Sequence, residues 1–81
     1  MLSKFKDFKK ISSSVEIINA KRIIVEEMIK IIDYSENRVV LDIGNRILTI
    51  CGFELSIYDY YNKNIVIDGV ITSVLFEWLI W

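Results

Sequence analysis

The sequence predicts a small all-β protein, and three observations support this. Hydrophobic residues make up 53% of the 81 residues and charged residues 26%, a composition that excludes an intrinsically disordered chain. Between residues 38 and 76, apolar and polar side chains alternate over several short stretches. Glycine or asparagine separates these stretches at near-even spacing, as between short strands joined by turns. We expect a single small domain, a curled antiparallel meander of about seven short strands with a short N-terminal helix.

Residues 1–11 have the pattern of a short amphipathic helix. Apolar residues recur at every third position from Leu2 to Ile11, with lysines between them. Because so short a helix is unstable alone, it either covers an edge of the core or rests as a basic foot on an anionic membrane surface. The candidate membrane or anion contacts are Lys4, Lys6, Lys9 and Lys10. A serine linker follows, which divides the chain into residues 1–14 and an all-β domain over residues 15–81.

Residues 15–33 carry conflicting local signals. On a helix, Glu26 and Lys30 would form a favourable i,i+4 pair, and charged and apolar side chains would separate onto two sides. The high content of valine and isoleucine favours an extended chain instead. The local pattern by itself slightly favours a helix, so the residues alone leave both structures open.

Two strands and a hairpin turn are predicted for residues 38–51. Residues 38–43 and 46–51 both alternate, and the Gly44-Asn45 pair between them is a strong signal for a two-residue hairpin turn. Gly52, directly after the second strand, predicts a break or a bulge.

Further strands are predicted for residues 53–58 and 65–76, separated by a turn at Asn62-Lys63-Asn64. Gly69 lies inside the second of these runs, where glycine usually marks a bulge or a kink. Strands at regular spacing with glycine corners also permit an alternative architecture, a β-solenoid-like stack. The predicted core consists of Ile17, Ile24, Ile31, Val39, Leu41, Ile43, Leu48, Ile50, Phe53, Leu55, Ile57, Ile65, Ile67, Ile71 and Phe76.

The residue types argue against catalysis. Histidine is absent and Cys51 is the only cysteine, so we expect no internal disulfide, no cysteine–histidine zinc site and no activated thiol. Cys51 is interpreted as a core thiol of a protein in a reducing, cytoplasmic setting. The acidic residues are scattered over strand ends and outward positions, where a solvated rim is their ordinary role. We therefore expect no enzyme, no cofactor and no metal site.

Two aromatic groups are candidates for contacts. Tyr58, Tyr60 and Tyr61 could stack nucleic-acid bases, but an acid, Asp59, lies among them. Nucleic-acid binding is therefore disfavoured there, and half-buried packing is expected. The apolar residues between 76 and 81 either pack on the sheet or form a patch for self-association or a partner protein. The candidate interaction residues are Phe76, Trp78, Leu79 and Trp81.

Four segments together carry a family resemblance: EIINAKRIIVE (residues 16–26), IIDYSENRVVL (31–41), LTICGFELSI (48–57) and IVIDGVITSVLF (65–76). In their order and spacing they resemble the YabP/YqfC family of sporulation proteins. The resemblance implies strands rather than a helix over residues 15–33. It also implies a non-catalytic protein of the mother cell in a spore-forming bacterium, linked to assembly at the forespore surface.

The expected partners follow from that resemblance and from the apolar residues 76–81. They are other sporulation or coat proteins, and further copies of the chain in a homo-oligomer. The alternative hypothesis from the residues is a peripheral membrane-surface or nucleic-acid binding module that uses the basic N-terminal segment.

Overall fold

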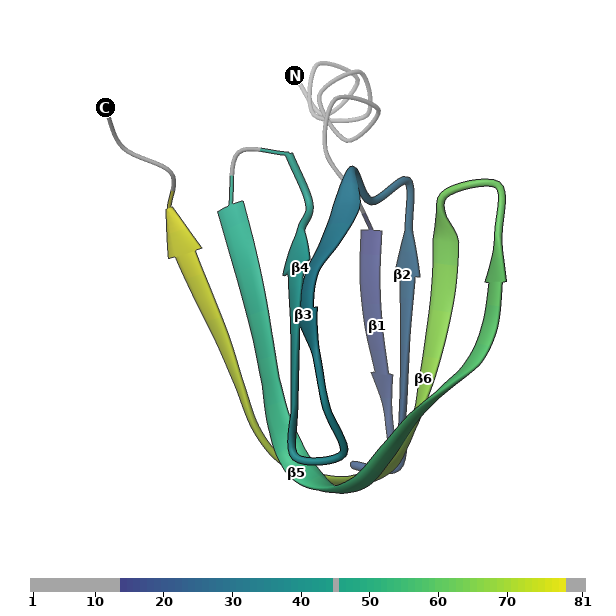
Figure 1. Ribbon diagram of the computed structural model, residues 1–81, viewed down its shortest axis with the longest axis vertical. Coiled ribbons are helices and arrows are strands. Elements are labelled where there is room, and N and C mark those ends of the chain that lie inside the picture. Colours follow the sequence, from purple (N-terminus) through teal and green to yellow (C-terminus); the bar gives the residue numbers. More distant parts are fainter. Residues whose placement is uncertain (1–13, 45, 79–81) are drawn as a thin grey trace, which may run out of the picture.

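The computed structural model describes residues 14–44 and 46–78, which form one antiparallel sheet of six strands (Figure 1). Along the chain the strands are β1 (Ser14–Ile18), β2 (Arg22–Glu26), β3 (Lys30–Tyr34), β4 (Arg38–Asp42), β5 (Arg46–Tyr61) and β6 (Asn64–Trp78). The predicted all-β antiparallel fold is confirmed, and every ladder is antiparallel, unlike a solenoid stack. The expected N-terminal helix lies outside the described residues.

The described part has six strands rather than about seven because neither central glycine ends a strand. Gly52 lies within the 16-residue β5 and Gly69 within the 15-residue β6. The predicted irregularity is present, since the β5–β6 register shifts between Cys51 and Gly52 and again between Phe53 and Ser56. The glycines therefore bend two long strands: Gly52 marks a bulge and not a break, and Gly69 marks a kink inside one strand, as expected.

Residues 15–33 form strands, as the family resemblance implied and the local helical pattern did not. From β1 to β5, each strand begins eight residues after the one before it. Five-residue strands alternate with three-residue connections, a spacing too short for helices. The described residues contain no helix that could span a bilayer.

The bend in β5 and β6 folds the sheet back on itself, so that the molecule has the shape of a V (Figure 1). We call one arm the β1 half: β1, β2, residues 64–68 of β6 and residues 56–61 of β5. The other arm is the β3 half: β3, β4, residues 46–51 of β5 and residues 73–78 of β6.

The strand order β1-β2-β6-β5-β4-β3 departs from a simple meander. β2 pairs with β6 and not with β3, so the connection between β2 and β3 passes from one half to the other. Its backbone is held on both sides: the Met28 N–H donates to the Lys63 carbonyl at 2.9 Å, and the Ile29 N–H to the Asp42 carbonyl at 2.8 Å. The Met28 side chain is fully buried, so this connection covers the open end of the core.

The two halves follow the same backbone plan. In the β1 half, the turn before β2 accepts two hydrogen bonds from the bend of β6, from Gly69 N–H to Lys21 O and from Ile71 N–H to Ala20 O. In the β3 half, the turn before β4 accepts two from the bend of β5: Gly52 N–H donates to Asn37 O, and Leu55 N–H to Glu36 O. The strands after these turns have the similar sequences RIIVE in β2 and RVVLD in β4.

Gly52 and Gly69 let the two bent strands cross closely. A Cβ atom at Gly52 would lie 1.9 Å from the carbonyl oxygen of Val70, which is inside any tolerable contact. A Cβ at Gly69 would lie 2.8 Å from the carbonyl oxygen of Glu54, and its φ of +147° disfavours any residue with a side chain. Glycine at both positions is therefore a condition of the V shape.

The core lies between the two halves. Both inner faces contribute fully buried side chains, and Leu55 and Ile71 close the core at the bend. The buried residues are Ile23, Val25, Met28, Val39, Leu41, Ile43, Leu48, Ile50, Leu55, Ile65, Ile67 and Ile71. The prediction for the core is thus confirmed from Val39 onward at nine positions, while Ile31 and Ile57 are partly buried against it.

Four predicted core residues are wrong. Ile24 faces outward because its neighbours Ile23 and Val25 oppose Ile67 and Ile65 across the β2–β6 ladder. Phe53 is 58% exposed, because Glu54 adopts a left-handed backbone (φ +53°) and changes the face of β5 there. Ile17 and Phe76 lie on strands with one open edge, where the opposite layer does not cover them, and both are exposed.

The three tyrosines also differ from expectation. Tyr58, Tyr60 and Tyr61 lie on strand β5, and where half-buried packing was expected all three side chains are more than half exposed. The turn that follows them is as predicted: Asn62 and Lys63 both have positive φ, the geometry of a tight hairpin turn. The predicted turn at Gly44 is also confirmed, since the Ile43 N–H donates to the Arg46 carbonyl at 3.1 Å.

Candidate interaction surface

Exposed apolar side chains gather on the second half of β6. β2 pairs with β6 only as far as Asp68, so beyond the bend no described strand pairs with this edge. Leu75 is 53% exposed, Phe76 39% and Trp78 62%. An apolar strand with one open edge can accept a further strand through its free backbone groups.

Arg46 stacks on the aromatic side chains of this edge. Its guanidinium carbon lies 5.0 Å from the centre of the Phe76 ring and 5.3 Å from that of Trp78. The ladder explains the contact, because Arg46 is directly opposite Trp78 and Leu48 is opposite Phe76. The buried Nε of Arg46 has no hydrogen-bond partner among the described residues. These three side chains, which we call the Arg46 cluster, hold the two exposed aromatic rings in place.

A second arginine cluster lies in the β1 half. Arg22 donates two hydrogen bonds to the carboxylate of Asp68, from Nε at 2.6 Å and from Nη2 at 2.8 Å. The hydrogen bond to Arg22 lowers the pKa of Asp68, and the same bond raises the pKa of Arg22. Arg22 also lies over the ring of Tyr58, 4.6 Å from its centre. This ion pair links β2 to β6, and the opposite charges of Arg22 and Asp68 neutralise each other.

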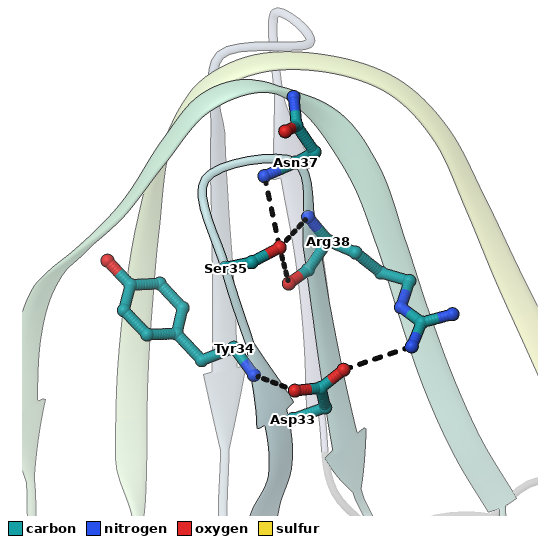
Figure 2. Close-up of polar contacts among 5 residues, drawn as sticks. All are labelled: Asp33, Tyr34, Ser35, Asn37 and Arg38. Atoms are coloured by element: carbon teal, nitrogen blue, oxygen red, sulfur yellow. Dashed lines mark hydrogen bonds and ion pairs between the residues drawn. The ribbon is translucent and has the colours of Figure 1, made fainter.

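The turn between β3 and β4, in the β3 half, is held by a small polar network (Figure 2). Arg38 Nη2 lies 3.0 Å from Asp33 Oδ2, and this hydrogen bond lowers the pKa of Asp33. The hydroxyl of Ser35 accepts hydrogen bonds from the backbone N–H groups of Asn37 and Arg38. The Asn37 amide donates to the carbonyl of Gly52 at 3.1 Å, so the turn is fixed to the bend of β5.

Among residues 14–44 and 46–78, the remaining strand edges without a partner are β1, β3 and the second half of β5. β3 exposes Ile32 and Tyr34, and β5 exposes the three tyrosines with Asp59. No cluster of acidic and cysteine side chains within the described residues could hold a metal ion.

Two of the four predicted interaction residues are on this surface. Phe76 and Trp78 lie on β6 and are exposed. Leu79 and Trp81 lie outside the described residues, as do the candidate membrane or anion contacts Lys4, Lys6, Lys9 and Lys10.

The sequence reasoning missed Arg46 and the edge strand β3. The only local signal at Arg46 was its place just after the Gly44-Asn45 turn, which says nothing about the aromatic residues 30 positions later. The apolar side chains of β3 were visible in the sequence, but their exposure follows from the strand order.

The fold and this surface define a class: a small antiparallel β protein whose described residues present open, apolar strand edges. A family model describing the YabP family matches residues 9–78. The chain therefore belongs to the YabP family and is a sporulation-associated protein. No curated protein and no solved structure matches it.

Proposed function

We propose that this chain is a non-catalytic assembly protein of sporulation that acts at the forespore surface through protein–protein contacts. Membership of the YabP family supports the link to sporulation. The observation that carries the assembly role is the apolar edge of β6, where Trp78 and Leu75 are more than half exposed. Exposed tryptophan is favoured at protein contacts, where it contributes a large share of the binding energy.

The charges of the described residues also support protein partners over nucleic acid. They include six lysines and arginines against ten aspartates and glutamates. Two of the six cations, Arg22 and Arg38, are paired with acids. A protein surface that binds nucleic acid needs an excess of unpaired positive charge, because phosphate contacts provide most of the affinity.

The test is the position of an N-terminally tagged copy during sporulation, in a host that lacks its own copy. We expect a shell or focus around the forespore. Trp78→Ala should make this signal diffuse. Tyr61→Ala, which truncates an even more exposed aromatic residue in the other half, should leave the signal in place. A diffuse signal from the unmodified chain in cells that form normal spores would contradict the proposal.

The alternative function, binding to an anionic membrane surface, has its own supporting observation. Four of the ten lysines and arginines fall within residues 1–13, with a single acid, Asp7. Such a segment favours anionic lipid headgroups. Vesicles with and without anionic lipid test this: removal of residues 1–10 should abolish binding, and binding should weaken as salt is added. Binding that is absent or insensitive to salt would exclude this function.

A further inference from the structure

The β3 half of the sheet has two open edges, which lie at opposite ends of its strand order. One is β3, and the other is residues 73–78 of β6; no described strand pairs with the outer side of either. Both carry exposed apolar side chains, such as Ile32 on β3 and Leu75 on β6. Edges of this kind are usually blocked unless they pair with another chain.

The two edges are complementary when they are placed antiparallel. Ile31 is opposite buried Leu41 on β4, and Phe76 is opposite buried Leu48 on β5, so both point to the core side of the sheet. If Phe76 of one copy lies opposite Ile31 of another, the inner faces of the two sheets are continuous. On the Lys30 side of Ile31, where the β3–β4 ladder is regular, the period of two along a strand then decides the neighbouring pair.

In that register, Glu77 lies opposite Lys30. Both point outward in their own copies, because Lys30 is opposite Asp42 and Glu77 is opposite Ile47. Neither has an ion-pair partner among the described residues. Beyond Ile31 the β3–β4 register shifts at Ile32, so the facing positions in this contact are Phe76 with Ile31 and Glu77 with Lys30. Opposite charges and apolar side chains in directly facing positions are what stabilises a pair of strands.

Two other pairings are less favourable. In the β1 half, the equivalent register places Tyr60 opposite Val15 and therefore Asp59 opposite Glu16, two like charges on one face. Pairing β6 with β6 of a second copy about a two-fold axis gives Glu77 no positive partner and leaves β3 open. Charge complementarity thus selects the contact between β6 and β3.

We propose that a second copy of this chain occupies the β6 edge, with its β3 strand antiparallel to residues 73–78. This inference deepens the proposed assembly function and rests on it for its biological role. Because the contact joins two different surfaces, a pair of copies keeps one free β3 and one free β6 at its two ends, and repetition builds an open row of copies. The row continues one sheet from copy to copy.

The experiment is a charge exchange on the purified full chain, followed by sedimentation velocity over a range of concentrations at low salt. Wild-type chain should associate as concentration rises. Glu77→Lys alone and Lys30→Glu alone should each lower the association constant roughly tenfold, because each replaces an attractive pair by a repulsive one. An equimolar mixture of the two variants should recover wild-type association, since each then meets its opposite charge.

Matched controls separate this contact from a general effect of net charge. Glu26→Lys and Lys21→Glu make the same charge changes at exposed positions away from both edges, and should associate like the wild type. All four substituted side chains are exposed, so the folded state should be retained, which circular dichroism checks.

Three outcomes would overturn the inference. The first is a wild-type chain that stays monomeric at every concentration. The second is loss of association in Glu77→Lys with none in Lys30→Glu, which indicates two-fold pairing of β6. The third is a mixture that does not recover. Association in solution is independent of position in the cell, so a chain that assembles as described but is diffuse during sporulation contradicts only the proposed function.

Discussion

The β1 half and the β3 half share a backbone plan but not a surface. In both, a turn accepts two hydrogen bonds from the bend of a long strand, and an arginine begins the next strand. Arg22 of the β1 half is opposite Asp68 and pairs with it, whereas Arg38 of the β3 half is opposite Cys51 and pairs with Asp33 in its own hairpin.

The open strand edges of the two halves also differ in the side chains that they carry. The far end of β5, in the β1 half, carries tyrosines around Asp59, and the far end of β6, in the β3 half, carries leucine, phenylalanine and tryptophan. One plan therefore supports a polar edge in one half and an apolar edge in the other. Hydrogen bonds and glycines therefore specify the V shape, while side chains on the open edges are left to specify contacts.

The largest expected effect is on the stability of the bend, and it tests whether β5 and β6 approach each other equally closely at Gly52 and at Gly69. Gly52→Ala should destabilise the fold by about 3 kcal/mol or more, because its Cβ would lie 1.9 Å from a backbone oxygen that cannot move independently. Gly69→Ala should cost less, about 1–3 kcal/mol, since its closest contact is 2.8 Å. Urea unfolding of both variants measures the difference. Equal losses would show that the bend relaxes at both glycines.

A smaller effect tests the orientation of β2 against the core. Ile23→Ala should destabilise the protein by about 2–5 kcal/mol, because Ile23 is fully buried opposite Ile67. Ile24→Ala, one position on and facing outward, should cost about 1 kcal/mol or less. Val39→Ala makes the same kind of test in the β3 half, because Val39 is the core position of β4 that matches Ile23 of β2. A larger loss of stability in Ile24→Ala than in Ile23→Ala would mean that β2 buries its opposite face.

The smallest effect compares the two ion pairs through pH. The pKa of Asp68 is lowered by Arg22, so its ionised form stabilises the fold fully above about pH 4, the ordinary value for aspartate, and this contribution is lost as pH falls through the lower pKa of the folded state. Asp68→Asn should therefore be less stable at neutral pH and lose less stability between about pH 4 and 2.

Asp33→Asn should show the same change more weakly. The pKa of Asp33 is also lowered, by Arg38, but its side chain is more exposed and makes one hydrogen bond to arginine where Asp68 accepts two. Thermal unfolding across this pH range separates the two. A wild-type profile in Asp68→Asn would show that the pair between β2 and β6 contributes nothing measurable.

Much of the second half of the fold could be predicted from the sequence. The alternation in residues 38–51 placed Val39, Leu41, Leu48 and Ile50 on the core face correctly, because apolar and other residues there occupy opposite faces. Residues 23–25 gave no such contrast: all three are apolar, so either face could be buried. Their orientation depends on the pairing with β6, whose residues 65–67 lie 40 or more positions further along the chain.

The candidate surface was predictable only in part. The sequence made Phe76 and Trp78 candidate contact residues, since such residues need either cover or a partner, but it left open whether they are covered by the sheet. The facing edge on β3 and the position of Arg46 did not, because both depend on which strands end up at the sides of the sheet.

Four features follow from the sequence alone: the chain is all-β, two of its tight turns fall at residues 44–45 and 62–63, two glycines allow β5 and β6 to bend, and the chain belongs with the YabP family. These depend on local conformational preference and on the order of short segments along the chain. Only the tertiary structure decided which face of β2 is buried, that β2 pairs with β6, and which edges stay open. Those depend on long-range register, because an apolar strand can pair in several ways and the burial of the whole core selects one.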